Sequence, residues 1–226
     1  MPDEIRTCID VFPDPQPKTA TERMALVQGK SWGSGWTLRI RFLEGDAAVQ
    51  AKVKAVAKKW LDFANIYFAF VDAEPSHVRI GFAKGAGSWS LIGKDSLTIK
   101  NVAMPTMNLG WLTPETPDHE YSRVVLHEFG HALGCIHEHQ HPAAGIDWNK
   151  PAVYDYYKKT NGWDQAKVDK QIFDAYDRNL LVSTKAADPQ SIMMYPIPPG
   201  FANNLVVGWN EQLSATDQTF IRSVYV

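Results

Sequence analysis

The alternation of apolar and polar positions changes its period early in the chain. Four apolar residues alternate with polar ones and predict a strand with one buried face: Trp36, Leu38, Ile40 and Phe42. Asp46 then stands where a helix N-cap belongs, and apolar residues recur at helical spacing from there to about residue 64. The pattern therefore predicts a strand over 36–42 and an amphipathic helix over 46–64.

Short apolar runs dominate the next fifty residues. Four of them have the length and composition of strands: Ile66–Val71, Val78–Phe82, Leu97–Val102 and Met107–Leu109. Between them, Gly85–Gly93 is rich in Gly and Ser. We expect these strands to form a mixed twisted sheet with the helix as its backing, in an α+β fold.

A second helix is predicted from about Tyr121 to Leu133, and the composition of the sequence changes after it. Residues 138–212 hold many Pro, Gly, Asn and Asp, with one helix expected after Asn149-Lys150-Pro151. Ser214 to Asp217 resembles a capping box and predicts a short terminal helix. The second half is thus expected to be an irregular lobe that ends in a helix.

Composition narrows the classes of protein that fit this pattern. The chain has 226 residues, of which 45% are hydrophobic and 21% charged, with a formal net charge of −2. We expect no nucleic-acid partner, since a binding surface for a polyanion is normally basic. No apolar stretch approaches the roughly 18 residues that cross a bilayer. The first six residues, Met1 to Arg6, do not resemble a signal peptide, so the location stays open, with secretion favoured over the cytoplasm.

The predicted second helix contains a group of residues typical of a catalytic zinc site. His127 and His131 are four residues apart, so one helical face presents both imidazoles to a single zinc ion. Glu128 lies about 100° around the helix from His127, where its carboxylate can reach a water on the metal without binding the metal. Gly134 can take a left-handed conformation that ends the helix and lets the chain reverse, so that His137 becomes the third ligand. Three neutral imidazoles leave one zinc position open, as in catalytic sites.

The full motif resembles that of the metzincin clan of zinc peptidases, which has a second mark, a methionine turn. Ser191-Ile192-Met193-Met194-Tyr195 fits that turn, and together with Glu138, directly after the third histidine, it is most similar to the astacin family. The resemblance implies a two-lobed α+β catalytic domain. It also implies that Met193 forms an apolar floor beneath the zinc and that the Tyr195 phenol bonds the oxyanion formed from a peptide carbonyl.

The implied function is that of a zinc-dependent endopeptidase, a hydrolase of protein or peptide substrates with Glu128 as general base. The substrate backbone is expected to pair with a strand edge near Gly87–Ile92. Two alternatives remain open from the residues. One is a catalytically weak zinc-containing binding or toxin-like module, which would not need Glu128. The other is a zinc hydrolase that acts on a non-peptide amide.

We interpret residues 1–34 as a leader, either a prosegment or a surface strap, and residues 35–226 as the catalytic domain. The upper lobe is expected to span about 35–134 and the lower lobe about 135–226. The two cysteines connect the leader to the site by hypothesis: Cys8 ligates the zinc and inhibits the enzyme, pairs with Cys135, or is free.

His139 and His141 follow the motif closely and raise the question of a second metal site. We expect solvated loop histidines instead, since no carboxylate cluster with suitable spacing accompanies them. The segment 139–142 also lacks the arginine that is usual there in astacins.

Overall fold

A five-stranded mixed sheet carries the first half of the chain in the computed structural model. The strand order is β3-β2-β4-β6-β5, and all neighbours are parallel except β5, which runs antiparallel to β6 at the sheet edge. The strands are β2 (Trp36–Phe42), β3 (Ile66–Phe70), β4 (Val78–Gly81), β5 (Ser88–Ser90) and β6 (Met107–Leu109). The predicted α+β class with a mixed sheet is confirmed.

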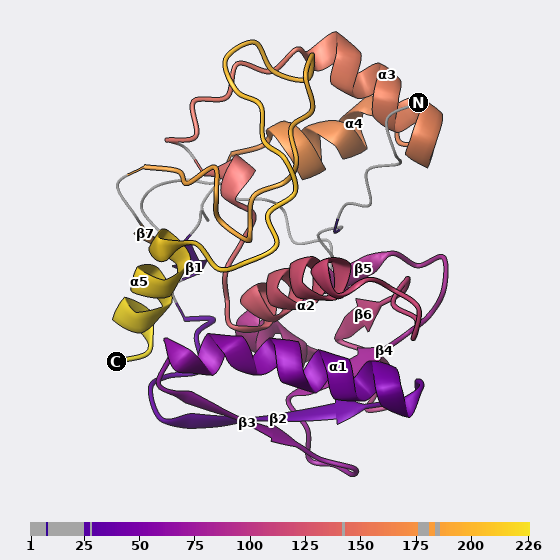
Figure 1. Cartoon of the computed structure of the whole chain (residues 1–226), viewed down its shortest axis with the longest axis vertical. Helices are drawn as coiled ribbons and strands as arrows, with labels where there is room; N and C mark the ends of the chain where they lie inside the picture. The colour runs from indigo at the N-terminus through magenta and orange to yellow at the C-terminus, as the bar shows by residue number, and fades with distance from the viewer. Residues whose placement is uncertain (1–7, 9–24, 28, 142, 176–180, 184–185) are drawn as a thin grey trace.

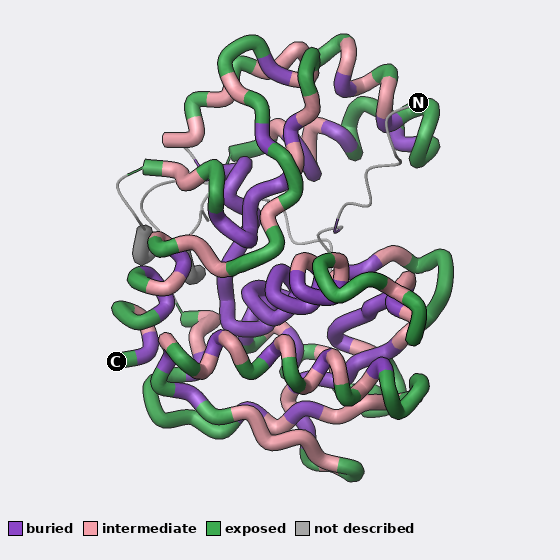
Figure 2. The backbone as a smooth tube through the Cα atoms, viewed as in Figure 1, coloured by how far each residue is buried: buried purple, intermediate pink, exposed green. Residues whose placement is uncertain are grey.

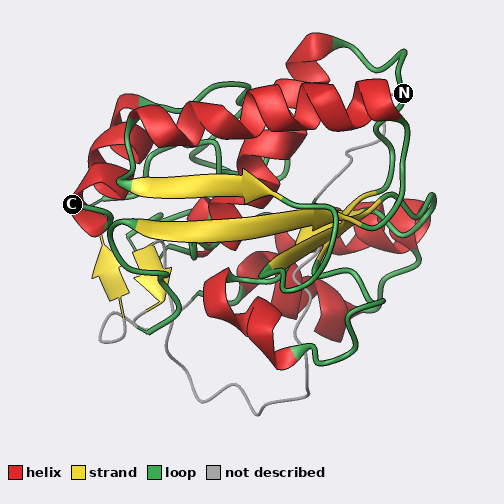
Figure 3. Cartoon of the chain, turned by 90° about the horizontal axis from the view of Figure 1, so that it is seen from below, coloured by secondary structure: helices red, strands yellow, loops and turns green. Residues whose placement is uncertain are grey.

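The structure describes residues 8, 25–27, 29–141, 143–175, 181–183 and 186–226. Most of the leader predicted over 1–34 therefore lies outside the described residues. Strand β1 (Ala25–Val27) pairs antiparallel with β7 (Leu181–Ser183) in a separate two-stranded sheet near the C-terminus. Figure 3 shows this small sheet apart from the larger one.

The helix expected over 46–64 forms in two parts. Helix α1 (Ala47–Ala57) begins at Asp46, whose Oδ1 accepts from the backbone N–H groups of Ala48 and Val49 at 2.7 and 3.2 Å. A 3-10 turn, η1 (Lys58–Asp62), continues it. In that turn Trp60 is buried and donates its Nε1–H to the carbonyl of Leu126 at 3.0 Å. Residues of α1 and η1 thus pack with the sheet and with the second long helix into one core.

Helix α2 (Asp118–Ala132) is the second long helix, and it begins three residues before the predicted start. Burial is unbroken from residue 124 to residue 141, that is, through the helix end and the segment beyond it. Figure 2 shows this stretch in the interior of the molecule. A buried helix end needs partners for its last carbonyls. Trp32 supplies one by donating Nε1–H to Ala132 O at 2.8 Å, and the Tyr225 hydroxyl supplies another by donating to Leu133 O at 2.6 Å.

The second half of the chain holds short elements joined by long connections, as predicted. They are η3 (Glu138–Gln140), α3 (Lys150–Asn161), α4 (Gln165–Val168), the π-helical turn η4 (Asp169–Phe173) and α5 (Ala215–Val224). Helices α3 and α4 lie on the opposite side of α2 from the sheet (Figure 1). Helix α5 begins with the expected capping box of Ser214 and Asp217, and it buries Phe220 and Ile221 in the same core as the sheet.

One predicted strand, Leu97–Val102, is wrong. Residues Gly93–Thr98 form a 3-10 turn, η2, in which the Thr98 hydroxyl donates to Asp95 O at 2.7 Å. The Arg79 guanidinium then binds the carbonyls of Ile99 and Met104, at 2.9 and 2.8 Å. These carbonyls therefore face a side chain instead of a neighbouring strand. Strand β5 forms inside the Gly- and Ser-rich stretch, within the Gly87–Ile92 segment where a strand edge is expected.

Among the helices that the structure describes, none combines the length and the apolar character needed to cross a membrane.

Candidate metal centre and active site

Three histidine side chains from α2 and the segment after it converge on one point. The Nε2 atoms of His127, His131 and His137 lie 3.1–3.2 Å from one another. All three residues are at least nine-tenths buried. The predicted triad is thus assembled by one helical turn and one chain reversal.

Backbone carbonyls determine the tautomers of two of these rings. His127 Nδ1 lies 2.8 Å from Ile192 O, and His131 Nδ1 lies 2.8 Å from Cys135 O. A carbonyl only accepts, so each Nδ1 carries the proton and each Nε2 presents a lone pair. Two lone pairs directed at each other do not form a hydrogen bond. A cation between them satisfies both, and the carbonyl partners are the kind of support that metal-bound histidines have.

Burial favours the neutral rings that a metal requires. It lowers the pKa of His127 well below its usual value, and the neighbouring His131 and His137 act in the same direction. A borderline-soft set of three imidazoles matches zinc better than a hard cation. The residues present therefore fit a zinc ion, held by His127, His131 and His137.

Two glycines give the site its shape. Gly134 has φ +104°, the left-handed region, and there the chain leaves the helix and turns His137 back. Gly130 faces Met193, and a Cβ at this glycine would overlap the Met193 sulfur. Met193 is completely buried against α2.

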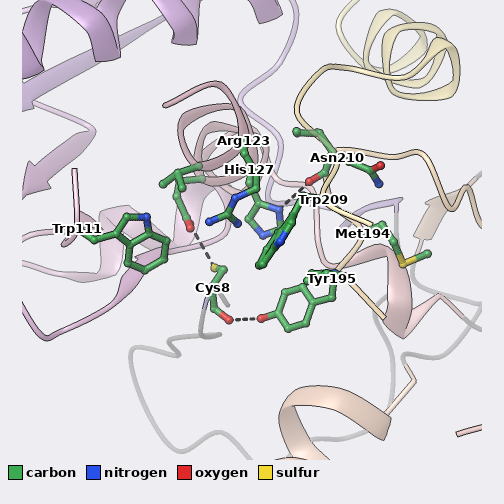
Figure 4. A pocket seen from close by; sticks show the side chains of 12 residues that line it. Cys8, Trp111, Arg123, His127, Met194, Tyr195, Trp209 and Asn210 are labelled. Atoms are coloured by element: carbon green, nitrogen blue, oxygen red, sulfur yellow. Dashed lines mark hydrogen bonds between the residues drawn. The ribbon is translucent and has the colours of Figure 1, made fainter. Parts of the chain in front are cut away.

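Cys8 lies close to all three parts of the predicted machinery. Its Sγ belongs, with the three histidines, to a group of ligand atoms within 4.8 Å of one another. The same Sγ lies 3.3 Å from Glu128 Oε2, and the Cys8 carbonyl accepts a hydrogen bond from the Tyr195 hydroxyl. Figure 4 shows Cys8 between the helix and Tyr195. Glu128 and Tyr195 are both buried, at 2% and 4% exposure.

The two cysteines are not joined to each other. Cys8 and Cys135 are both buried, and no disulfide links them. Cys135 is part of the large core, where burial raises the pKa of its thiol far above the usual value. Of the three hypotheses for Cys8, the disulfide is therefore not formed in this structure.

Two buried acidic residues, Glu138 and Asp217, form hydrogen bonds to the methionine turn, Ser191–Tyr195. The Glu138 backbone N–H donates to Met193 O at 2.9 Å, and its carboxylate accepts from the Asp188 N–H at 2.7 Å. Burial raises the pKa of Glu138 to about 8. Asp217 of α5 accepts from the Ser191 hydroxyl at 2.7 Å and from the Ile192 N–H at 2.8 Å. The methionine turn is thus hydrogen-bonded to Glu138, which follows His137, and to helix α5.

The expectation that His139 and His141 are solvated is wrong. Both are 3% exposed, and His139 packs its ring against Tyr195. Its Nε2 lies 3.0 Å from the carbonyl of Gln171 in η4. Sequence spacing contains no signal for this contact, because it depends on a turn more than thirty residues away.

A pocket opens beside His127 and Glu128, and its rim is aromatic (Figure 4). The Arg123 guanidinium lies 4.2 Å from the ring centre of Trp209 and 5.9 Å from that of Trp111. Both Arg123 and the Trp111 indole N–H bind the Glu120 carboxylate, at 2.6–2.8 Å. Sequence analysis did not identify these rim residues, of which Trp209 comes from a segment far from the others in the chain.

Comparison with known proteins gives one family. The model of the Astacin family of peptidases matches residues 28–226. No curated protein matches the chain. Among solved structures, "Structure of myroilysin" is 43% identical, covers 89% of this chain and 98% of that chain, and has a TM-score of 0.85.

Two further structures are similar over most of the chain. "Crystal structure of myroilysin" is 37% identical, covers 97% of this chain and 98% of that chain, and has a TM-score of 0.68. High choriolytic enzyme 1, a hatching enzyme zinc-protease from Oryzias latipes (Medaka fish), is 18% identical, with coverage of 91% and 98% and a TM-score of 0.60. At that identity the last similarity supports the fold alone.

The family model, the high identity over most of the chain and the triad of buried histidines agree with one another. This chain belongs to the astacin family of peptidases and is a zinc metalloendopeptidase.

Proposed function

We propose that the chain cleaves internal peptide bonds with Glu128 as general base and Tyr195 as hydrogen-bond donor to the carbonyl oxygen. The observation that carries this proposal is the position of Cys8. A single residue bonds to the Glu128 carboxylate and the Tyr195 hydroxyl and places its sulfur within 4.8 Å of the histidine ligand atoms. A peptide bond in the same place would meet the same three groups.

Each residue has a distinct part in the proposed reaction. A zinc ion at the three histidines supplies positive charge that acidifies an adjacent water and polarises the substrate carbonyl. Glu128 accepts the proton of the attacking water and then donates it to the leaving amine. Tyr195 donates its phenolic proton in a hydrogen bond to the oxygen on which negative charge develops. A phenol, with an ordinary pKa of about 10, remains a donor at neutral pH.

The substrate backbone is proposed to extend alongside β5, near Gly87–Ile92. In support, β5 is the end strand of the five-stranded sheet and has a single neighbour, β6, among the described strands. It also lies against α2. Added strands gain affinity from backbone hydrogen bonds, so the proposed cleavage needs little sequence specificity from this contact.

Glu128→Gln, made in the Cys8→Ser chain as parent, tests the general base. We expect casein cleavage to fall by about 10²–10⁴-fold while zinc content stays at one ion per chain. Glu115→Gln, an exposed carboxylate in the segment before α2, is the matched control and should cleave casein like the parent. Zinc loss together with activity would instead assign Glu128 a ligand or support role. A Cys8→Ser chain that binds zinc but cleaves neither casein nor gelatin would favour the binding-module alternative.

We also propose that the leader, residues 1–34, inhibits the catalytic domain, residues 35–226, through Cys8. The support is the same set of contacts, since a thiolate beside three imidazoles is a strong zinc ligand. The Cys8 thiol also contacts Glu128 and its carbonyl accepts from Tyr195, so the base and the donor are engaged as well.

Three forms of the protein test this latency: the full chain, a Cys8→Ser variant and a chain that starts near Ser31. We expect higher casein cleavage in both altered forms than in the full chain. Equal activity in all three forms would contradict inhibition by the leader, yet would leave the peptidase reaction itself intact.

A further inference from the structure

His139 occupies a position that the chemistry assigned so far does not explain. It is 3% exposed and lies two residues after the third metal ligand, at the centre of η3. Its ring centre is 4.2 Å from that of Tyr195, with the planes tilted by 32°. The ligand His137 meets the same Tyr195 ring edge-on, at 4.4 Å. The phenol ring is therefore packed against two imidazoles.

The His139 ring is itself held by the second half of the chain. Its Nε2 lies 3.0 Å from Gln171 O, and because a carbonyl only accepts, Nε2 carries a proton and donates. Trp148 meets it edge-on, with ring centres 6.4 Å apart and planes at 89°. The adjacent Gln140 also donates Nε2–H to Gln171 O, at 3.2 Å. The Gln171 carbonyl thus orients the His139 ring, and the His139 ring packs against Tyr195.

A hydrogen-bond donor contributes to catalysis only when its atom is in place before the charge forms. A tyrosine reaches the site through two rotatable side-chain bonds, and rotation about the first would move its hydroxyl by several ångströms. The aromatic contacts with His137 and His139 restrict that rotation, and each such contact is favourable beyond simple burial.

We propose that His139 is a positioning residue that holds the Tyr195 phenol in the orientation in which it donates to the substrate carbonyl. This proposal rests on the donor role proposed for Tyr195. It predicts that the effect of changing His139 passes through Tyr195 and disappears when the hydroxyl is absent.

A double-mutant cycle tests the proposal, with all variants made in the full chain carrying Cys8→Ser. The variants are His139→Ala, Tyr195→Phe and the pair, each measured for kcat, KM and zinc content. We expect His139→Ala to lower kcat by about 10–100-fold, as for a misplaced catalytic group, with KM and zinc content close to those of the parent. In the Tyr195→Phe background the same change should have no further effect on kcat.

Two more variants distinguish an orienting effect of His139 on Tyr195 from a general weakening of the contact between η3 and η4. Gln140→Ala removes a donor to the same Gln171 carbonyl and leaves the His139 ring in place, so kcat should stay near the parent value. His139→Phe keeps a flat ring against Tyr195 and should recover part of kcat, and it serves if His139→Ala does not fold. A phosphinic peptide, which imitates the tetrahedral intermediate, gives a readout other than turnover. Its affinity should fall in His139→Ala, but not when Tyr195 is already Phe.

The outcomes are distinguishable. An equal loss of kcat from His139→Ala in both backgrounds, or the same loss in Gln140→Ala, would overturn the positioning role while leaving Tyr195 as donor. If Tyr195→Phe alone has the same kcat as the parent, the donor role proposed for Tyr195 is contradicted. The positioning role of His139 is then contradicted with it.

Discussion

Two backbone carbonyls determine what the nitrogens of His127 and His131 can do. Because Ile192 O and Cys135 O each accept a hydrogen bond from Nδ1–H, both Nε2 lone pairs are directed inward. One of these carbonyls belongs to the methionine turn and the other to the reversal after Gly134. The site therefore includes two main-chain oxygen atoms, which a motif of side chains does not predict.

Tyr195→Phe is the most direct test at this scale. The change removes one hydroxyl and keeps the ring packed against His137 and His139. We expect kcat for a peptide substrate to fall by about 10²–10³-fold, the usual effect of removing one oxyanion donor, with a much smaller change in KM. Steady-state kinetics on the zinc-loaded protein measures both, and unchanged kcat would limit Tyr195 to packing.

The sequence predicts the residues of the site that lie close together in the chain. His127, Glu128 and His131 follow from helical spacing, and Gly134 and His137 follow from the need to end the helix. His139 was misjudged, because its burial comes from η4, a segment that spacing does not connect to it. For Cys8 three alternatives stayed open, since contact between residues 8 and 128 depends on the path of the whole chain.

At the scale of secondary structure, the end of α2 decides whether the third ligand reaches the metal. Gly134 adopts φ +104°, a conformation that costs a residue with a side chain about 1–2 kcal/mol. We expect Gly134→Ala to lower the free energy of unfolding by about that amount and also to weaken zinc binding, because Cys135 O supports His131.

Gly200→Ala is the matched control for that change. Gly200 has φ +91°, and nothing lies within 4 Å of where its Cβ would be. Denaturant unfolding should show a similar loss of stability, while zinc titration should give the parent affinity. Equal zinc affinity in both alanine variants would mean that the helix end does not position His131 and His137.

Helix α5 is tied to the methionine turn by Asp217. Its carboxylate accepts from Ser191 and Ile192, so Asp217→Ala leaves buried donors without their acceptor, at about 1–3 kcal/mol each. Thermal unfolding should show a large decrease in Tm. Asp155→Ala, which removes an exposed ion pair with Lys159, should change Tm little. Similar Tm values for both variants would contradict a structural role for this tie.

The sequence predicts elements well where one local pattern dominates them. The capping box of Ser214 and the Pro151 start of α3 are both present in the structure. The strand predicted over Leu97–Val102 failed because Gly93–Thr98 form a 3-10 turn and the Arg79 side chain binds the Ile99 carbonyl. Strand β5 has only three residues, too few for an alternating pattern to predict it, whereas the family resemblance implies a strand edge near Gly87–Ile92.

For the molecule as a whole, the metal is expected to act as a cross-link as well as a catalyst. It joins α2 to the chain beyond the helix end, in a region that is buried without a break from residue 124 to residue 141. Zinc that binds only the folded state at about 1,000 times its Kd adds roughly 4 kcal/mol of stability. We expect a chelator to lower Tm and to abolish casein cleavage, and added zinc to restore both.

Glu128→Gln provides an internal comparison for that experiment. Its Tm should respond to chelator as the parent does, although its cleavage is already low, because the ligands are intact. A parent whose Tm and cleavage both remain unchanged in excess chelator would contradict a zinc site at the three histidines.

The bond from Tyr225 to Leu133, and those from Asp217 to the methionine turn, have a consequence for synthesis. Helix α2 lies some ninety residues before Tyr225, which bonds the carbonyl at the end of the helix, and before Asp217, which bonds the methionine turn. A ribosome-bound chain that has emerged only as far as residue 213 contains every ligand but lacks these supports. The site therefore reaches its final form only once α5 has left the exit tunnel, so a nascent chain has little capacity to digest its neighbours.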